Sequence, residues 1–372
     1  MTARERFINT LTYQPTDRVP FLEIAMWGQT QERWEREGMP PGMSMGLMTG
    51  CEHFGLEGYD AVDMSLAPMP AFDTVVLHED EREETFIDGW GRTRRALKEG
   101  TVRGTRLTMD QYMDFPVRDR ESFLAMRRRY ESDPIERYPG DWASVAGRMT
   151  QTDMPRTVLN PLGGTFGYYS MLRNWIGTER LSYLFHDDPA LIDECLECLS
   201  DFVTRLLAKA LSEATFDFYI IHEDMAGKGG PLMGPQLFRR FLSPHYRRLM
   251  EFFHGHGVEL ILVDTDGDFE ALIPEFLDAG VNGFCPMEVA AGMDPVAMRR
   301  RYGKTFSMLG GIDKREVAKG REAIDRLIDD VVRPLVEEGG YIPTIDHSIP
   351  PDVSYGDFQY WLERKRDTLA VT

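Results

Sequence analysis

The stretch "VELILVDTDGDFEALIPEFLDAG", residues 258–280, contains one complete folding unit of this chain. Its first part, 260–263, is apolar at every position, which is typical of a strand covered on both faces in a parallel sheet. A turn rich in aspartate follows, and Asp268 is placed to cap a helix predicted over 269–279. A buried strand, a turn and a returning helix together predict a βα unit.

The same unit recurs along the second half of the chain. Further strands are predicted at 216–224, 281–289, 304–313 and 341–347, and helices at 188–211, 294–302, 320–338 and 355–369. Such alternation predicts a parallel sheet covered by helices. No G-x-G-x-x-G or G-x-x-x-x-G-K sequence follows any of these strands, which disfavours a doubly wound nucleotide-binding fold. We therefore predict an α/β fold of the (β/α)8 TIM barrel type.

The first part of the chain departs from this alternation. A helix at 2–11, a strand at 18–26, extra helix and loop at 30–55 and a strand at 58–66 are predicted there. Residues 72–100 alternate apolar and polar side chains around an acidic turn, which predicts an inserted antiparallel β-hairpin. Helical stretches then lead to a strand at 156–164. We expect a single domain over 1–372, with extra N-terminal helices and a hairpin and helical insertion at about 70–152.

Composition and charge disfavour several classes of function. The formal net charge of −19 leaves no basic stripe, so neither nucleic-acid binding nor attachment to anionic lipid is expected. The N-terminus is charged throughout, and no run approaches the ~18–20 apolar residues of a membrane span, so we expect a cytoplasmic protein. Cys195 and Cys198 lie in a predicted helix without a second pair, and we expect buried, reduced thiols there.

Polar side chains gather after the predicted strands, where the carboxyl rim of a TIM barrel forms its active site. They are His222, Glu223, Asp224, Asp264, Asp266, Cys285, Glu288, Asp313, Asp346 and His347. Most are carboxylates, which repel one another unless a cation, a bound proton or an imidazolium offsets them, so a divalent metal is expected. Asp264 and Asp266, spaced i, i+2, share one face of an extended strand end.

Structural alternatives stay open for several of these residues. His222 can be an ordinary strand histidine, Asp264 and Asp266 can support a turn, and Asp313 can cap a helix, as is expected for Asp294. His347 is the leading candidate for function, because an imidazole beside an aspartate in a loop braced by two prolines does not suit an ordinary core position.

Four segments together resemble the uroporphyrinogen decarboxylase superfamily, which includes corrinoid-linked methyltransferases. They are "RERFINTLTYQPTDRVPF" (4–21), "HEDMAGKGGPLMGPQLFRRFLSPHYRRL" (222–249), "DTDGD" (264–268) and "GGYIPTIDHSIPPDVSYGDFQYW" (339–361). The resemblance covers nearly the whole chain and is strongest from about residue 216 onward. It implies a (β/α)8 barrel, and a homodimer is expected from it alone.

Departures from the decarboxylase pattern bear on the reaction. Decarboxylases of this family carry arginines in an N-terminal loop that bind substrate carboxylates, whereas the matching stretch here, "FLEIAMWGQT" (21–30), has none. The aspartate that holds the pyrrole nitrogens has no convincing match in "DMSLAPMP" (63–70). Without this clamp a substrate with eight carboxylates suits a protein of charge −19 poorly, so tetrapyrrole decarboxylation ranks second.

The methyltransferase branch implies a metal site. Its thiol-activating members bind zinc through a His-x-Cys pair and a later cysteine, and these positions fall on Asp264, Asp266 and His347. Oxygen and imidazole ligands would make a harder Lewis-acid site, with zinc as the expected metal, and Glu223 or Glu288 would complete it. The resemblance therefore implies methyl transfer from a small methoxy- or methylamine-type donor to a corrinoid carried by a partner protein.

The remaining candidates would orient groups or contact substrate. Asp346 would orient His347, and Asp224 stands where decarboxylases have a serine and so would touch substrate, with His222 and Glu288 nearby. An apolar wall is expected from Tyr168, Tyr169, Met171 and Trp175, for which core packing is the alternative. The non-enzymatic alternative is a barrel that only binds a corrinoid or tetrapyrrole.

Overall fold

A computed structural model describes residues 1–47, 49–103, 105–106, 108–159 and 166–369 of the 372-residue chain. A parallel sheet of seven strands forms its centre, in the order β1-β8-β9-β12-β13-β14-β15. The strands are β1 (Asp60–Val62), β8 (Arg156–Val158), β9 (Phe218–His222), β12 (Leu260–Asp264), β13 (Gly283–Cys285), β14 (Ser307–Ile312) and β15 (Tyr341–Ile345). The α/β class and the parallel sheet are confirmed; of the strand predicted at 156–164, residues 160–164 lie outside the described residues.

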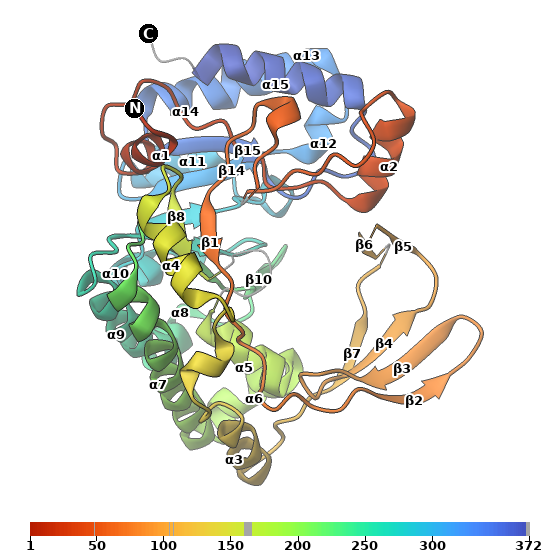
Figure 1. The fold of residues 1–372 in the computed structure, drawn as a ribbon, viewed down its shortest axis with the longest axis vertical. Helices are drawn as coiled ribbons and strands as arrows, with labels where there is room; N and C mark the ends of the chain where they lie inside the picture. Colours follow the sequence, from red (N-terminus) through yellow and green to blue (C-terminus); the bar gives the residue numbers. More distant parts are fainter. Residues whose placement is uncertain (48, 104, 107, 160–165, 370–372) are drawn as a thin grey trace.

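Helices return between the strands and cover the sheet. They are α7 (Pro189–Glu213), α8 (Pro235–Leu237), η3 (Phe238–Leu242), α9 (Ser243–His254), α10 (Ile273–Asp278), α11 (Pro295–Tyr302), α12 (Lys314–Val317), α13 (Arg321–Leu327), η6 (Ile328–Val332), α14 (Arg333–Glu338) and α15 (Tyr355–Leu369). Figure 1 shows α7, α9 and α10 along one side and α13, α14 and α15 at another. In the described part of the chain no helix combines the length and apolar character that crossing a membrane requires.

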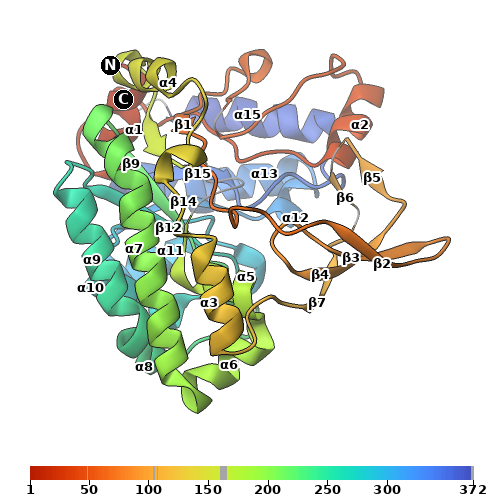
Figure 2. The ribbon, with the colours of Figure 1, turned by 60° about the horizontal axis from the view of Figure 1, so that its bottom comes forward.

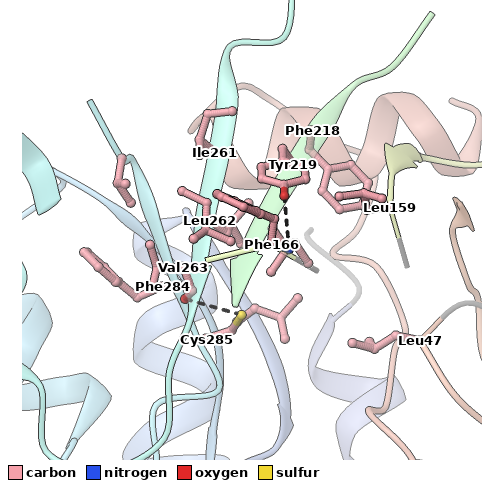
Figure 3. Close-up of a cluster of buried hydrophobic side chains, with 14 of the residues drawn as sticks. Leu47, Leu159, Phe166, Phe218, Tyr219, Ile261, Leu262, Val263, Phe284 and Cys285 are labelled. Atoms are coloured by element: carbon pink, nitrogen blue, oxygen red, sulfur yellow. Dashed lines mark hydrogen bonds between the residues drawn. The ribbon is translucent and has the colours of Figure 1, made fainter. Parts of the chain in front are cut away.

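The core lies between these helices and the strands. Figure 3 shows Ile261 and Val263 of β12 beside Phe284 of β13, with Cys285 at the strand end, where its thiol donates to the Val263 carbonyl over 3.6 Å. The strands are apolar on both faces because both faces are covered. Cys195 is buried in α7, and burial raises the pKa of Cys198, in the same helix, to about 11.

The strand predicted at 18–26 is wrong. This segment makes only isolated bridges, from Ala25 and Met26, so among the described residues no ladder joins β15 to β1. The carboxylate of Glu23 replaces a backbone acceptor of the missing strand, since it accepts the backbone N–H of Ile345 over 2.9 Å. A buried strand edge needs an acceptor for each N–H, and a side chain can supply it as well as a backbone. Closure into eight strands stays a prediction.

The inserted segment forms a larger sheet than the predicted hairpin. Strands β2 (Val75–Glu79), β3 (Glu83–Ile87), β4 (Thr93–Leu97) and β7 (Gln111–Asp114) form a four-stranded antiparallel sheet, and β5 (Thr101–Val102) pairs with β6 (Thr105–Arg106). Figures 1 and 2 show this sheet projecting beyond the helices. Strands β2 and β7 are mostly exposed, so the alternation of apolar and polar residues here belongs to a sheet with little hydrophobic core of its own.

Side-chain contacts to two helices help to hold the inserted segment to the rest of the molecule. Arg92 donates to the side-chain oxygen of Asn174 over 2.6 Å, on helix α5 (Tyr168–Ile176), which leads into α6 (Thr178–Asp187). Arg103 pairs with Glu35 over 2.6 Å, on helix α2 (Gly28–Arg36). Helices α1 (Ala3–Leu11), α3 (Arg120–Arg128) and α4 (Trp142–Gln151) and the short helices η1 (Glu52–Phe54) and η2 (Pro134–Arg137) also lie outside the βα units.

Candidate functional site

Two histidine–carboxylate pairs lie at the carboxyl ends of the central strands. The imidazole Nδ1 of His222 is 3.2 Å from a carboxylate oxygen of Asp264, and Nε2 of His347 is 3.2 Å from one of Asp266. The first pair follows from strand register, because His222 ends β9 directly opposite Asp264 at the end of β12. Asp266 and His347, predicted from separate strands to share one rim, are therefore brought into contact.

The second pair joins segments that follow two strands that are not neighbours in the sheet. Strands β12 and β15 are three places apart in the sheet order. In a flat sheet this separation would be about 14 Å, from a spacing of about 4.8 Å between neighbouring strands. Asp266 and His347 follow these two strands by two residues each, and their side chains meet across the intervening strands β13 and β14.

His222 has the geometry of a proton donor. Burial disfavours its charged form, but the hydrogen bond and negative charge of Asp264, aided by Asp224 and Glu223, outweigh this and raise its pKa to about 9. Its side chain is 43% exposed, and Nε2 has no hydrogen-bond partner among the described residues. A carboxylate on one ring nitrogen fixes the ring and leaves the other free for chemistry.

The His222–Asp264 pair makes the stability of the fold depend on pH. The pKa of an ordinary imidazole is about 6.5 and that of His222 in the fold is about 9, so folding favours the protonated form. The pair therefore stabilises the fold fully below about pH 6.5, and this contribution is lost as the pH rises through about 9. We expect the free energy of unfolding in urea to fall over that range, and an NMR titration of His222 to have its midpoint near pH 9.

The variant Asp264→Asn keeps the shape of the pair and removes its charge. We expect the midpoint of His222 to drop toward the ordinary value in this variant and the pH dependence of stability to weaken. A wild-type midpoint at or below about 6.5 would contradict an ion pair at this position.

The second imidazole is more enclosed. Burial opposes its charge, but the hydrogen bond and charge of Asp266 raise the pKa of His347, and this imidazole in turn lowers the pKa of Asp266 against its own burial. Nδ1 of His347 is buried without a hydrogen-bond partner among the described residues. Asp346, predicted to orient this ring, instead accepts the backbone N–H of Val289 over 3.1 Å and lies 3.5 Å from Lys314. It therefore anchors neighbouring loops.

Glu223 holds the start of helix α5. Its fully buried carboxylate accepts the backbone N–H groups of Tyr169 and Ser170 over 3.0 and 2.9 Å, the Ser170 hydroxyl over 3.1 Å, and the hydroxyl of Tyr246. Burial raises its pKa to about 7 in spite of these donors. The free N–H groups of a helix N-terminus favour such an acceptor. Its neighbour Asp224 forms an ion pair with Arg173 of the same helix.

The structure places the predicted apolar wall in the core. Tyr168, Tyr169, Met171 and Trp175 all lie in α5 and are at most 3% exposed. The indole of Trp175 packs against the ring of Tyr130 with 5.0 Å between centroids. These four side chains therefore pack in the core, which was the alternative to a substrate-contacting wall. Asp313, similarly, caps α12 through the N–H of Arg315 over 2.8 Å.

The predicted metal ligands do not come together as one set. Within the described residues, no three His, Cys, Asp or Glu side chains are grouped so as to hold a metal ion. Asp264 contacts His222, Glu223 accepts the N–H groups at the start of α5, and Glu288 accepts the N–H of Gly267. Asp266 and His347 remain as a pair. Two ligands do not make a zinc site, which takes three or four. As placed, the donor set does not fit the expected ion.

A cavity of about 270 Å³ beside Asp266 was not anticipated from the sequence. It is lined by Ala226, Gly227, Lys228, Asp266, Gly267, Glu288, Ala290, Ala291 and Arg315. Lys228 reaches it from the turn between β10 (Ala226–Gly227) and β11 (Gly230–Pro231). The run "GKGG" (227–230) directly after the β9 polar cluster is the signal that could have pointed to this turn.

Comparisons with known proteins agree with the fold. The profile of the family described as uroporphyrinogen decarboxylase (URO-D) matches residues 148–367. Uroporphyrinogen decarboxylases from two strains of Thermus thermophilus are each 23% identical over 266 residues, covering 68% of this chain and 71% of theirs. A methyltransferase from Methanosarcina mazei has a similar structure, with a TM-score of 0.63, 15% identity and 99% of both chains covered. This chain therefore belongs to the uroporphyrinogen decarboxylase family.

Proposed function

We propose that the protein is a methyltransferase that removes a methyl group from a small methoxy- or methylamine-type donor and passes it to a corrinoid protein. The observation that carries this proposal is the contact of His222 Nδ1 with Asp264 at the strand rim, which leaves Nε2 without a hydrogen-bond partner among the described residues, while the carboxylate raises the pKa of the ring. Removing a methyl group from oxygen leaves a poor leaving group, which a positioned acid stabilises.

The side chains supply the proton for this reaction. When the carbon–oxygen bond breaks, its electron pair stays on oxygen, and Nε2–H of His222 donates a proton to give a neutral alcohol. Asp264 keeps the ring oriented and stabilises its charged form before transfer, and solvent reprotonates the ring afterwards. A reduced corrinoid on the partner protein would supply the electron pair that accepts the methyl group.

Decarboxylation of a tetrapyrrole is the second candidate, and it rests on the two Thermus relatives. The charges near the rim argue against it, since a substrate with many carboxylates needs unpaired cations. Three cations close to the rim are already paired, namely Arg173 with Asp224, Lys314 with Asp346, and Arg315 with Asp313, which leaves Lys228, and one lysine is too few to bind several carboxylates. The loop that lacks arginines also lies here, where Trp27 donates to the Ser348 carbonyl over 3.0 Å, next to His347.

Parallel assays on the purified protein test the proposal. Reduced cobalamin with a panel of methoxy and methylamine compounds should give the demethylated product and methylated cobalamin, while uroporphyrinogen should stay unchanged. Loss of carboxylates from uroporphyrinogen without methyl transfer would replace the proposal with decarboxylation. Binding of cobalamin with neither reaction would favour a non-catalytic barrel.

Metal analysis on the same samples tests the expected zinc. The sequence predicts roughly one divalent ion per chain, lost in Asp266→Ala and in His347→Ala. Unchanged metal content in both variants would discard that ligand set.

A further inference from the structure

The 270 Å³ cavity beside Asp266 is built by four consecutive loops of the rim. These loops follow β9, β12, β13 and β14, and small side chains, such as that of Ala290, line much of the space. Gly267 is needed for its shape: its φ is +82°, and a Cβ there would lie 2.5 Å from the backbone of Ala226. The N–H of Asp268 also donates to the Gly227 carbonyl over 3.0 Å. The hairpin that carries Lys228 is thus fixed closely against the Asp266 turn.

Four charged side chains line this cavity, and two of them are neutralised. Asp266 pairs with His347 over 3.2 Å, and Arg315 pairs with Asp313 over 2.7 Å.

The other two charges, Lys228 and Glu288, have no ion-pair partner in the described part of the chain. Glu288 is nevertheless held in place, since one of its oxygens accepts the N–H of Gly267 over 2.9 Å. One cation and one anion therefore face the same small space without a matching protein charge.

We infer that this cavity binds the head group of a small amino-acid-like zwitterion, with its ammonium against Glu288 and its carboxylate against Lys228. Hydrogen bonds between charged partners are stronger than those between neutral ones, and a ligand with both charges can pair with the exposed Lys228 and the half-buried Glu288 at once. The volume lies just below the ~300–1,000 Å³ usual for ligand pockets, which suits a head group and not a tetrapyrrole. This inference rests on the proposed function, because the head group would belong to the methyl donor.

A matched set of three methoxy compounds tests the ligand class by calorimetric titration of the full chain. O-methylserine carries both charges, 3-methoxypropanoate carries only the carboxylate, and 2-methoxyethylamine carries only the ammonium. We expect O-methylserine to bind at least about tenfold more tightly than either singly charged compound. Equal affinity for all three would overturn the inference.

Two variants test the residues. Glu288→Gln should lower the affinity for O-methylserine about tenfold or more and leave that for 3-methoxypropanoate unchanged, because the amide still accepts the Gly267 N–H. Lys228→Met should lower the affinity for O-methylserine and 3-methoxypropanoate and leave that for 2-methoxyethylamine unchanged. Lys319→Met, whose lysine pairs with Glu316 outside the cavity, is the control and should bind like the wild type. Unchanged O-methylserine affinity in both test variants would overturn the assignment.

Binding and catalysis fail in distinguishable ways. Tight, Glu288-dependent binding of O-methylserine without methyl transfer would leave the zwitterion site standing and count against the proposed reaction. Methyl transfer from neutral methoxy compounds, with no preference for O-methylserine, would support the reaction and overturn the zwitterion site.

Discussion

Replacing His222 with glutamine is expected to lower kcat for methyl transfer by about 10²- to 10⁴-fold, the range over which general acids act. Glutamine can still hydrogen bond to Asp264, but its amide is too weak an acid to transfer a proton to the departing oxygen. Because the loss concerns the transition state, KM for the donor should change little. Initial rates of product formation, measured over a range of concentrations of the most active methoxy donor, will give kcat and KM separately.

A control histidine lies away from the rim. His256 follows α9 and precedes β12, so it lies at the amino end of the strands, and His256→Gln should retain wild-type kcat. Wild-type activity should also fall above about pH 9, as His222 loses its proton. If His222→Gln kept kcat within about threefold of wild type while His347→Gln lost it, the acid would be His347 and the proposal for His222 would be wrong.

Replacing Lys365 with methionine is expected to lower the free energy of unfolding by about 3–5 kcal/mol, the usual cost of leaving a buried charge unpaired. Lys365 and Glu23 are completely buried side chains joined by a 2.8 Å ion pair. The same carboxylate also accepts the indole N–H of Trp361 over 2.7 Å and the backbone N–H of Ile345. Removing the lysine therefore leaves a buried carboxylate without its cation, between β15 and the segment 18–26. Urea denaturation followed by circular dichroism measures the change.

Removing both charges should restore part of the loss. In the double variant with Glu23→Gln and Lys365→Met neither member of this pair is charged, and the amide oxygen can still accept one of the N–H groups. The exposed pair of Lys319 and Glu316 is the comparison, and Lys319→Met should change stability little. If Lys365→Met lowered the free energy of unfolding no more than Lys319→Met does, this would contradict a buried ion pair between Lys365 and Glu23.

The helix caps and the buried contacts of Glu23 were predictable from the sequence to different extents. The Asp294 cap was predicted correctly because a cap depends on neighbours in the chain: Asp294 accepts the N–H groups of Val296 and Ala297 over 2.8 and 3.1 Å. Asp268 accepts the N–H of Glu270 over 3.1 Å, but the helical segment begins one residue later than predicted and its N-cap is Phe269. The role of Glu23 was not predictable, since its partner Ile345 is 322 residues away. The apolar run around Glu23 matched a strand pattern, and only its burial against α15 makes it a side-chain acceptor.

The sequence by itself determined the α/β class, the rim on which the polar residues fall and the family, because periodicity, caps and motifs are local properties of the chain. Only the tertiary structure decided which of those residues are partners. His222 meets Asp264 through the register of β9 and β12, Asp266 meets His347 across two intervening strands, and Glu223 turns inward to the start of α5. Pairing of this kind depends on distances between segments far apart in the chain, and residue order alone does not fix such distances.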